Sequence, residues 1–553
     1  MKQKILLGLA AAAVVGAPAL AQSNERGPGY NAALTQANSA TDWGRRGTYP
    51  NGEVAVSFAN QLCNPGTINV NWFSPGGSPG ATIQSDHPKF GFLVAREQDG
   101  RLVQISDWSY CKHAFFALSS PSVCGGTCQS TNGSQLGVSC SDVYSNGNNG
   151  SRNYLGPPAE INPWLGTWNS TGNYFDIGQP NQAGYPLPAD GIYSLSTTGY
   201  DAVEKRVTLQ ENLIPQGVDM FFQILVIVEG ERVENRANNI GTNTFRMTIA
   251  NPTATGTSAW TTTTGTSFQQ GTSILNRWTG ASIGTGSNGG TGTMADFDGR
   301  FQVAVKVTGP TNGLWHYEYA VLNVDNHGGG SAFSIPVCPT AKVLNLGFRD
   351  IDQNALNNWT ATVSGGEITW NAAVGNAHRW NQLFNFWFDS DAAPVAGLAT
   401  IDQATLLPGA QLSLTVPTSV PGLQPAVDLG AGCGTPSLQL AGNGLANIGN
   451  AGFGLLATSA PNTPFLTMFS SPSPSFSLPP GCNVYLNILS YSDLGLAFTD
   501  AGGNAFLPIP VSPLWTPFDM TFQALTFVPA PPLFGLFGLS NGLTVRFGGV
   551  GCQ

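Results

Sequence analysis

Alternation of apolar and polar residues with a period of two recurs along the chain and predicts antiparallel β-strands. In the stretch FQVAVKV, Phe301, Val303 and Val305 fall on one face of such a strand, and the intervening residues fall on the other. The segment FFQILVIVEG, residues 221–230, is apolar on both faces and predicts a central strand covered on both sides. No segment has the pattern of a long amphipathic helix. The pattern therefore predicts an all-β protein.

Turn signals separate the predicted strands. Gln98-Asp99-Gly100 and Ala501-Gly502-Gly503 each lie between two strand-like runs, and Asp-Gly and Gly-Gly supply the positive φ angles that tight hairpins need. The 69 glycines and 38 prolines, with only 10% charged residues, fit short strands and neutral polar loops.

Changes of composition divide the chain into regions. Residues 22–417 form a large N-terminal antiparallel β-rich region, which has the length of two β-sandwiches. Prolines punctuate 418–428, where we expect a linker. Residues 429–553 contain strand-like segments with turns about every ten residues, the spacing of a small C-terminal β-sandwich.

The first 21 residues predict a secretory signal peptide. Lys2 and Lys4 precede an apolar run that ends at the small-residue triplet Ala19-Leu20-Ala21. No later run is long enough to cross a bilayer, so no transmembrane segment is expected. The net charge is −10, and it becomes −12 without the two lysines of the signal peptide. An acidic exported chain disfavours nucleic acid as a partner.

Nine cysteines in an exported chain predict a disulfide framework with one thiol left over. We expect Cys63, Cys124, Cys128 and Cys140 to pair among themselves, although the sequence leaves their connectivity open. Cys433 and Cys482 are the expected pair of the C-terminal module.

Three of the five histidines are candidates for a metal site. His316 and Glu318 share one face of a predicted strand, and His87 and His113 could complete a three-nitrogen set for Zn²⁺ or Cu²⁺. A metal-bound water at such a site would act as a nucleophile. The alternative is that each imidazole makes a local hydrogen bond in a sheet or turn.

Calcium is the first cofactor candidate and Zn²⁺ or Cu²⁺ the second, although no cofactor is required by the sequence. Several predicted loops offer oxygen ligands, and calcium prefers such ligands. The candidates are Asp296, Asp298, Asp142, Asp389 and Asp391.

Motifs for other hydrolytic chemistry are weak. The three G-x-S-x-G matches, which begin at Gly76, Gly280 and Gly538, lack the strand, turn and helix that a nucleophile elbow needs. For glycoside hydrolysis, Glu318, Glu160 and Asp142 are candidates by residue type alone.

Several segments together resemble uncharacterised large secreted proteins of planctomycete-type bacteria. They include SYCKHAFFAL, LWHYEYAVLN, VLNLGFRDID and RWNQLFNFWFDSDAAP, and the tail with GAGCGTPSLQL and PPGCNVYLNI resembles their C-terminal module. The resemblance implies export and no particular reaction. Cys111 and Cys338 depart from the pattern together, and this departure implies that they pair with each other.

The sequence therefore predicts a secreted or cell-envelope protein, and its first functional reading is non-catalytic. It would bind a surface or an extracellular polymer in a structural or adhesive role, with a polymer or cell-surface component as partner. The alternative is a metal-dependent extracellular enzyme acting on polysaccharide or another polymer, built on His87, His113 and His316.

Overall fold

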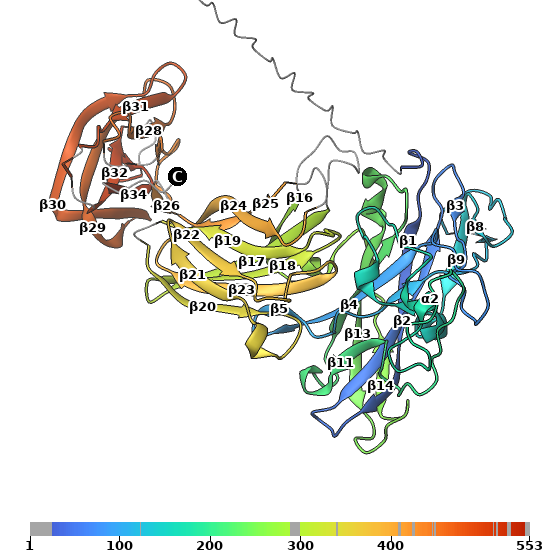
Figure 1. Ribbon diagram of the computed structural model, residues 1–553. Coiled ribbons are helices and arrows are strands. Elements are labelled where there is room, and N and C mark those ends of the chain that lie inside the picture. The colour runs from blue at the N-terminus through green and yellow to red at the C-terminus, as the bar shows by residue number, and fades with distance from the viewer. Residues whose placement is uncertain are drawn as a thin grey trace, which may run out of the picture.

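The chain is a series of β-sandwiches (Figure 1). The computed structural model describes residues 25–547, apart from 122, 288–298, 339–340, 407–410, 423–425, 445, 447–448, 480, 513, 516–517 and 528–531. All the pairings between strands in this part of the chain are antiparallel, as the alternating pattern predicts. The all-β prediction, with a large N-terminal region and a small C-terminal sandwich, is confirmed.

Two sheets form the first sandwich. One sheet contains β1 (Ala33–Arg46), β2 (Glu53–Cys63), β9 (Cys140–Tyr144), β7 (Ser120–Pro121) and β11 (Val207–Gln210). The other contains β10 (Leu155–Gly156), β6 (Cys111–His113), β4 (Lys89–Gln98), β12 (Met220–Ile227), β13 (Ile240–Ile249), β14 (Trp260–Thr264), β5 (Arg101–Gln104) and β15 (Gln269–Gln270). A small separate sheet pairs β3 (Val70–Asn71) with β8 (Gln135–Leu136).

The core of the first sandwich is rich in aromatic rings. Phe58 on β2 stacks on Phe222 on β12 with ring centroids 4.2 Å apart, and Phe245 on β13 meets Phe58 edge-on. These residues are fully buried between the two sheets. Burial of aromatic side chains is a main source of stability in such a sandwich.

The second sandwich also has two sheets. One contains β16 (Ser282–Ser287), β17 (Arg300–Thr311), β18 (Leu314–Asn323), β23 (Gln382–Ser390) and β20 (Val343–Arg349). The other contains β21 (Thr360–Ser364), β22 (Glu367–Asn371), β19 (Gly330–Pro336), β24 (Pro394–Gln403) and β25 (Ser413–Pro421). Phe333, Trp370 and Phe386 lie at the centre of its core.

A further apolar layer joins the two sandwiches. Leu93 on β4 and Leu225 on β12 belong to one buried cluster with Leu322 on β18 and Leu383 on β23. The sheet of β4 and β12 is therefore covered on both faces, which explains why residues 221–230 are apolar at nearly every position.

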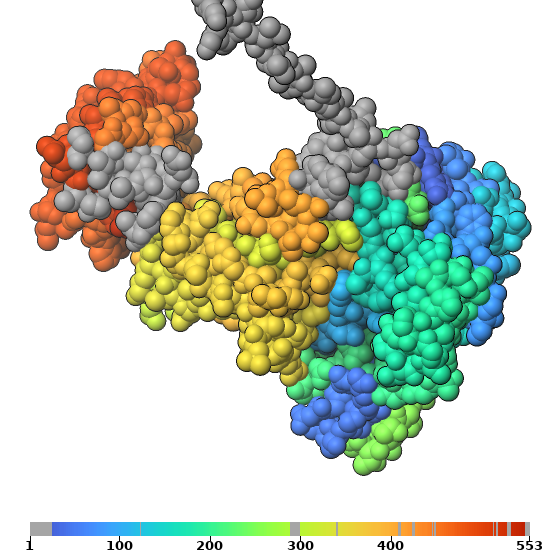
Figure 2. Space-filling view, viewed as in Figure 1, coloured from blue at the N-terminus to red at the C-terminus, as the bar shows by residue number. Residues whose placement is uncertain are grey.

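The C-terminal module has two sheets around its own core. The larger contains β26 (Val427–Gly430), β34 (Gly542–Phe547), β32 (Phe518–Thr526), β29 (Pro464–Leu478), β30 (Cys482–Phe498) and β33 (Gly538–Leu539). The smaller contains β27 (Gln439–Gly442), β28 (Gly454–Thr458) and β31 (Asn504–Pro508). Figure 2 shows this module as a separate body beside the second sandwich.

Turn predictions have mixed outcomes. β4 and β5 form the predicted hairpin, with Asp99 at φ 53° and Gly100 at φ 80°. The second predicted hairpin is wrong, because β30 pairs with β29 and β31 pairs with β28. The turn at 501–503 instead carries the chain from one sheet of the C-terminal module to the other. β25 ends at Pro421 and β26 begins at Val427, both within the range expected for the linker.

Helices are short. Two α-helical turns, α1 (Asn146–Asn149) and α2 (Tyr174–Ile177), lie in the long loops of the first sandwich. Short 3-10 helices occur at Arg152–Tyr154, Pro158–Glu160, Glu211–Leu213, Val233–Asn238, Ile274–Arg277 and Ala355–Asn357. Among the described residues, no helix is long and apolar enough to cross a membrane.

Candidate functional site

A cleft of about 600 Å³ lies where the first sandwich meets a loop of the second. Its walls come from the end of β1 and the start of β2, from residues 105–110 between β5 and β6, and from residues 204–210 leading into β11. The loop 351–353, which follows β20, contributes the opposite side. Segments that are far apart in the sequence therefore build one depression.

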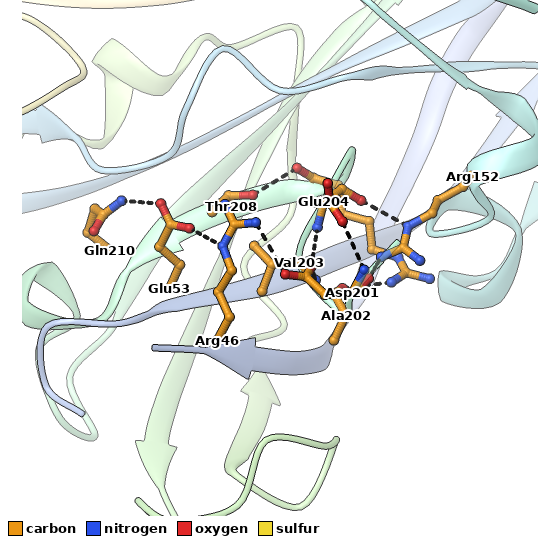
Figure 3. A network of polar contacts seen from close by, with 10 residues as sticks. Arg46, Glu53, Arg152, Asp201, Ala202, Val203, Glu204, Thr208 and Gln210 are labelled. Carbon is orange, nitrogen blue, oxygen red and sulfur yellow. Dashed lines mark hydrogen bonds and ion pairs between the residues drawn. The ribbon is translucent and has the colours of Figure 1, made fainter. Parts of the chain in front are cut away.

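A polar network fixes one wall of the cleft (Figure 3). Arg46 donates through Nε to Glu53 at 2.5 Å, and its Nη1 lies 3.3 Å from Asp201 Oδ2. Gln210 donates to the other oxygen of Glu53 at 2.7 Å. These contacts hold side chains of β1, β2 and β11 in one arrangement, although each is partly open to solvent.

The loop before β11 is held by its own hydrogen bonds. Asp201 Oδ1 accepts from the backbone N–H groups of Val203 and Glu204 at 2.7 and 2.9 Å, and Glu204 Oε2 accepts from the Asp201 N–H at 2.9 Å. Arg152 donates to the backbone carbonyls of Asp201 and Glu204, as Figure 3 shows. Reciprocal side-chain to backbone bonds of this kind stabilise a turn.

Two aromatic side chains line the cleft next to these charges. Trp108 donates its indole N–H to the carbonyl of Trp380 at 2.8 Å, so the second sandwich fixes its position. Tyr110 packs edge-on against Tyr174, with centroids 5.6 Å apart, and the ammonium of Lys205 lies 5.1 Å from the Tyr110 ring centre. Burial raises the pKa of Tyr110 to about 12, so the phenol stays neutral and can donate a hydrogen bond.

Asp107 is the unusual acid of the cleft. Solvent reaches its side chain, but protein surrounds it closely, and the resulting desolvation raises its pKa to about 6. Its Oδ1 accepts hydrogen bonds from the Ser109 hydroxyl at 2.5 Å and the Thr208 N–H at 3.0 Å, which oppose the shift. The Asp107 carboxyl therefore gains a proton, and loses its charge, when the pH falls a little below neutral.

A second depression of about 320 Å³ adjoins the first. The two share Asp352 and Gln353, and Gln353 donates to Asn212 at 3.4 Å across the boundary between the sandwiches. Phe348, Arg349 and Leu213 line the second depression. The two depressions therefore lie side by side along the junction, and we call them together the groove.

The structure brings together only two of the three predicted metal-binding histidines. His87 Nε2 and His113 Nδ1 lie 2.9 Å apart, and both rings are fully buried against Trp168. Burial first, and then the charge of Lys89, lowers the pKa of both imidazoles well below its usual range. The pair is therefore neutral, with one ring donating to the other.

His316 lies elsewhere, on the sheet of the second sandwich. Its Nδ1 is 2.7 Å from Asp389 Oδ1, and its Nε2 is 3.4 Å from Glu318 Oε2. The hydrogen bond to Glu318, against some burial, raises the pKa of His316. Glu318 itself receives a two-pronged ion pair from Arg101 at 2.5 and 2.6 Å.

The predicted metal centre of His87, His113, His316 and Glu318 is therefore not formed. Among the described residues, no group of three or more His, Cys, Asp or Glu side chains is arranged to hold a metal ion. The physical reason is that His316 and Glu318 project from β18, where Asp389 and Arg101 satisfy them. The two-residue spacing on one strand face correctly placed them side by side, but did not bring the other histidines to them.

The candidate calcium ligands are dispersed. Asp142 is buried on β9 and accepts from the backbone N–H groups of Leu118 and Val143. Asp389 bonds to His316 and Asn345, and Asp391 accepts from the Lys342 N–H at 2.8 Å. Asp296 and Asp298 lie outside the described residues. Each described carboxylate accepts at least one hydrogen bond from a protein donor.

The structure shows which cysteines form disulfides. Cys63 bonds to Cys124, Cys128 to Cys140, and Cys433 to Cys482. The pairing of Cys111 with Cys338 is wrong: Cys338 is disulfide-bonded, whereas Cys111 is a free thiol buried in the layer between the sandwiches. Burial raises the pKa of the Cys111 thiol, so it is unreactive.

Sequence reasoning missed the cleft residues Asp107, Trp108 and Tyr110. Their sequence signals are ordinary, because aromatic and charged residues in a loop between two strands occur throughout this chain. Only the docking of the second sandwich onto the 105–110 segment turns them into one site. Glu160, another candidate acid, accepts from the Trp168 indole and the Tyr174 N–H in a separate depression.

Comparisons with known proteins add little. No family model and no curated protein matches the chain. Among solved structures it matches the crystal structure of a variant of the major pilin subunit of Bacillus cereus, with 11% identity over 60% of this chain and 80% of that one. The TM-score is 0.17, which does not define a common fold, so nothing is carried over from that protein.

Proposed function

We propose that this protein is a non-catalytic extracellular protein that binds a polysaccharide along the groove between its two N-terminal sandwiches. The observation that carries the proposal is the pairing of two immobilised rings, Trp108 and Tyr110, with charged and amide side chains in one open cleft. Aromatic faces pack against the C–H groups of sugars, and flanking carboxylates, guanidinium groups and amides supply hydrogen bonds to hydroxyl groups.

The shape of the groove favours a polymer over a small molecule. The second depression extends the cleft past Asp352 and Gln353, so a bound chain has contacts over a longer path than one sugar ring needs. Side chains that are already hydrogen-bonded to the protein lose little freedom when a ligand arrives, which favours affinity. The disulfides support a location outside the cytoplasm.

Native electrophoresis through gels containing single polysaccharides tests the proposal. At least one polysaccharide should retard the mature chain, and Trp108→Ala should weaken that retardation about tenfold or more. Tyr185→Ala is the matched control, because Tyr185 is an exposed aromatic residue outside the cleft. Retention of full binding by Trp108→Ala, or no retardation by any gel, would exclude the groove as the binding site.

Asp107 supports a second candidate function, hydrolysis of the bound polysaccharide. A cleft carboxyl with a pKa of about 6 is protonated in part near neutral pH, which suits a general acid. Reducing ends should then accumulate when the protein is incubated with the retarding polysaccharide at pH 5 to 6, and Asp107→Asn should abolish this. Equal release by Asp107→Asn and the unmodified protein would remove this candidate.

A further inference from the structure

The C-terminal module carries very little charge. Residues 429–553 contain only the charged side chains Asp493, Asp500, Asp519 and Arg546, whereas 10% of the whole chain is charged. Large apolar side chains are exposed on the module instead. Exposed apolar side chains that adjoin one another are uncommon on a monomeric protein and indicate a surface that contacts something else.

A row of leucines crosses the outer face of the larger sheet of this module. Leu539 on β33 is directly opposite Leu525 on β32. Leu466 on β29 is opposite both Leu525 and Leu496, which lies on β30. Residues directly opposite each other in antiparallel strands share one face of the sheet. Leu539 is 4% exposed and Leu496 is 60% exposed, so this apolar face is covered only at its β33 end.

The chain itself supplies that partial cover. Leu533 packs with Leu539 and Leu525 in one cluster, and its N–H donates to the carbonyl of Phe537 at 2.9 Å to close the turn 533–537. Leu496 and Phe498 lie beyond this turn, and each is 60% exposed. The apolar face therefore continues past the segment that covers it.

β30 is also an open edge of the sheet. It pairs with β29 on one side, and among the described residues no strand pairs with its other side. Natural proteins usually protect such an edge with lysine or other charged residues, with proline, or with a bulge. β30 has no lysine or proline, and its one charged residue, Asp493, accepts from the Gly495 N–H at 3.0 Å. The bulge at 494–495 leaves two regular runs of open edge, 491–493 and 496–498.

The chemistry of this edge favours a second copy of the chain over a lipid surface. A bilayer cannot form hydrogen bonds with the backbone groups of an open strand. Residues 429–553 contain no lysine and a single arginine, so they offer little attraction to anionic headgroups. A second β30, related by a two-fold axis, runs antiparallel to the first and can both pair with its backbone and cover its apolar side chains.

The exposed apolar area matches a reversible contact. Six large side chains on β30 and in the two segments beside its outer face are exposed: Leu494, Leu496, Phe498, Phe527, Phe534 and Leu536. Together they expose on the order of 600 Å². A standard interface buries about 800 Å² per partner, and weak, transient interfaces bury less. Figure 1 shows β30 on the side of the module that faces away from the second sandwich, so the N-terminal region does not block it.

We propose that two copies of this chain associate through β30 of the C-terminal module and form a reversible dimer. The strands pair edge to edge, and Leu496 and Phe498 of each copy are covered in the contact. The dimer does not depend on the proposed function. If the groove binds a polysaccharide, two grooves can engage one polymer chain, which increases avidity without any new contact in either groove.

Sedimentation velocity of the mature protein at several concentrations tests the dimer. The unmodified protein should shift from monomer to dimer as its concentration rises through the micromolar range. Leu496→Lys places a charge in the contact and should weaken dimerisation about tenfold or more. Phe498→Lys alters the same face and should have the same effect. Both residues are exposed, so the melting temperature of each variant monomer should match that of the unmodified monomer.

Leu456→Lys is the matched control, because Leu456 is an exposed leucine on β28, in the smaller sheet of the same module, and the change of charge is identical. It should leave dimerisation unchanged. A monomer at every concentration, or equal weakening by Leu456→Lys, would overturn the proposal. Flotation with vesicles of neutral phosphatidylcholine tests the lipid alternative. Vesicle binding by a monomeric protein that Leu496→Lys abolishes would assign the face to lipid and overturn the dimer.

Discussion

Asp142 shows how burial at one residue controls the response of the protein to pH. Desolvation raises its pKa to about 7, although the N–H groups of Leu118 and Val143 oppose the shift. Because the folded-state pKa lies above the ordinary value of 3.8, the carboxyl contributes stability that is fully present below about pH 4. That contribution is lost as the pH rises through about 7.

We therefore expect Asp142→Asn to increase the free energy of unfolding at pH 8 and to change it little at pH 4. The asparagine oxygen keeps the two backbone hydrogen bonds, and the buried charge is removed. The expected gain at pH 8 is about 2 kcal/mol, roughly half of what a shift of this size allows. Urea unfolding at both pH values measures it, with the exposed Asp519→Asn as control. A loss of stability at pH 8 would show that the charged carboxylate is needed.

Also at the residue scale, the sequence shows which side chains can bind a metal or transfer a proton. It does not show which of these side chains contact one another in the fold. His87 and His113 come together because Lys89 on β4 is directly opposite His113 on β6. Nothing in the local sequence specifies that pairing, since the burial of a whole sheet determines it. His316 and Glu318 are neighbours through the two-residue period of one strand, and this relation could be read directly from the sequence.

At the scale of elements, the β4–β5 hairpin locks the first sandwich onto the second. Arg101 on β5 pairs with Glu318 on β18 through two hydrogen bonds, and Glu318 is almost completely buried. Removing one partner of such a pair leaves a buried charge without its counter-ion. Substitutions at Arg101 and Glu318 therefore test whether this ion pair stabilises the contact between the two sandwiches.

Glu318→Gln and Arg101→Gln should each destabilise the N-terminal region by about 2 kcal/mol, and the double variant should cost less than the sum of the two. Chemical denaturation of the four proteins gives the coupling energy. Glu97→Gln with Lys306→Gln is a suitable comparison, since that ion pair is longer, at 3.3 Å, and more exposed. Simple additivity for Arg101 and Glu318 would mean that they do not interact in solution.

In the C-terminal module, the Cys433–Cys482 disulfide joins strands in the way that the Arg101–Glu318 ion pair joins the two N-terminal sandwiches. It joins the start of β30 to the segment after β26 and closes a loop with a sequence separation of 49. Cys433→Ser combined with Cys482→Ser should lower the stability of this module by roughly 3 kcal/mol. The unfolding of the N-terminal region should not change, and tryptophan fluorescence together with calorimetry would separate the two. A shift in both regions would indicate that they unfold as one unit.

Strand positions were the most predictable elements, whereas connections were the least. Period-two patterns and Asp-Gly turns identify β4, β5 and β17 because those strands have one buried face or a tight local turn. The turn at 501–503 was assigned to a hairpin wrongly, because a turn residue does not reveal which sheet the next strand joins. The groove could not be predicted for the same reason, since it is formed by contacts between sandwiches.

At the scale of the whole molecule, the N-terminal sandwiches share a buried layer, while the C-terminal module has a core of its own. Figure 1 shows the module at the far end of the second sandwich from the first. We propose that the module is an accessory or attachment domain and that it folds independently of the groove.

Limited proteolysis should therefore cut first between Pro421, where β25 ends, and Val427, where β26 begins. Mass spectrometry should identify two stable fragments, one that keeps all of β25 and one that keeps all of β26, and the larger one should keep polysaccharide binding. The cause is that each fragment retains a complete hydrophobic core. First cuts inside a sandwich, or loss of binding by the larger fragment, would contradict independent folding or the location of the site.

Binding of the mature protein to an oligosaccharide array is the most direct test of the central claim, that the groove at Trp108 and Tyr110 holds a polysaccharide. The unmodified protein should bind a defined group of oligosaccharides and prefer longer chains. Trp108→Ala should lose that signal, and Tyr185→Ala should keep it. An empty array for the unmodified protein, or the same signal for Trp108→Ala, would contradict the account.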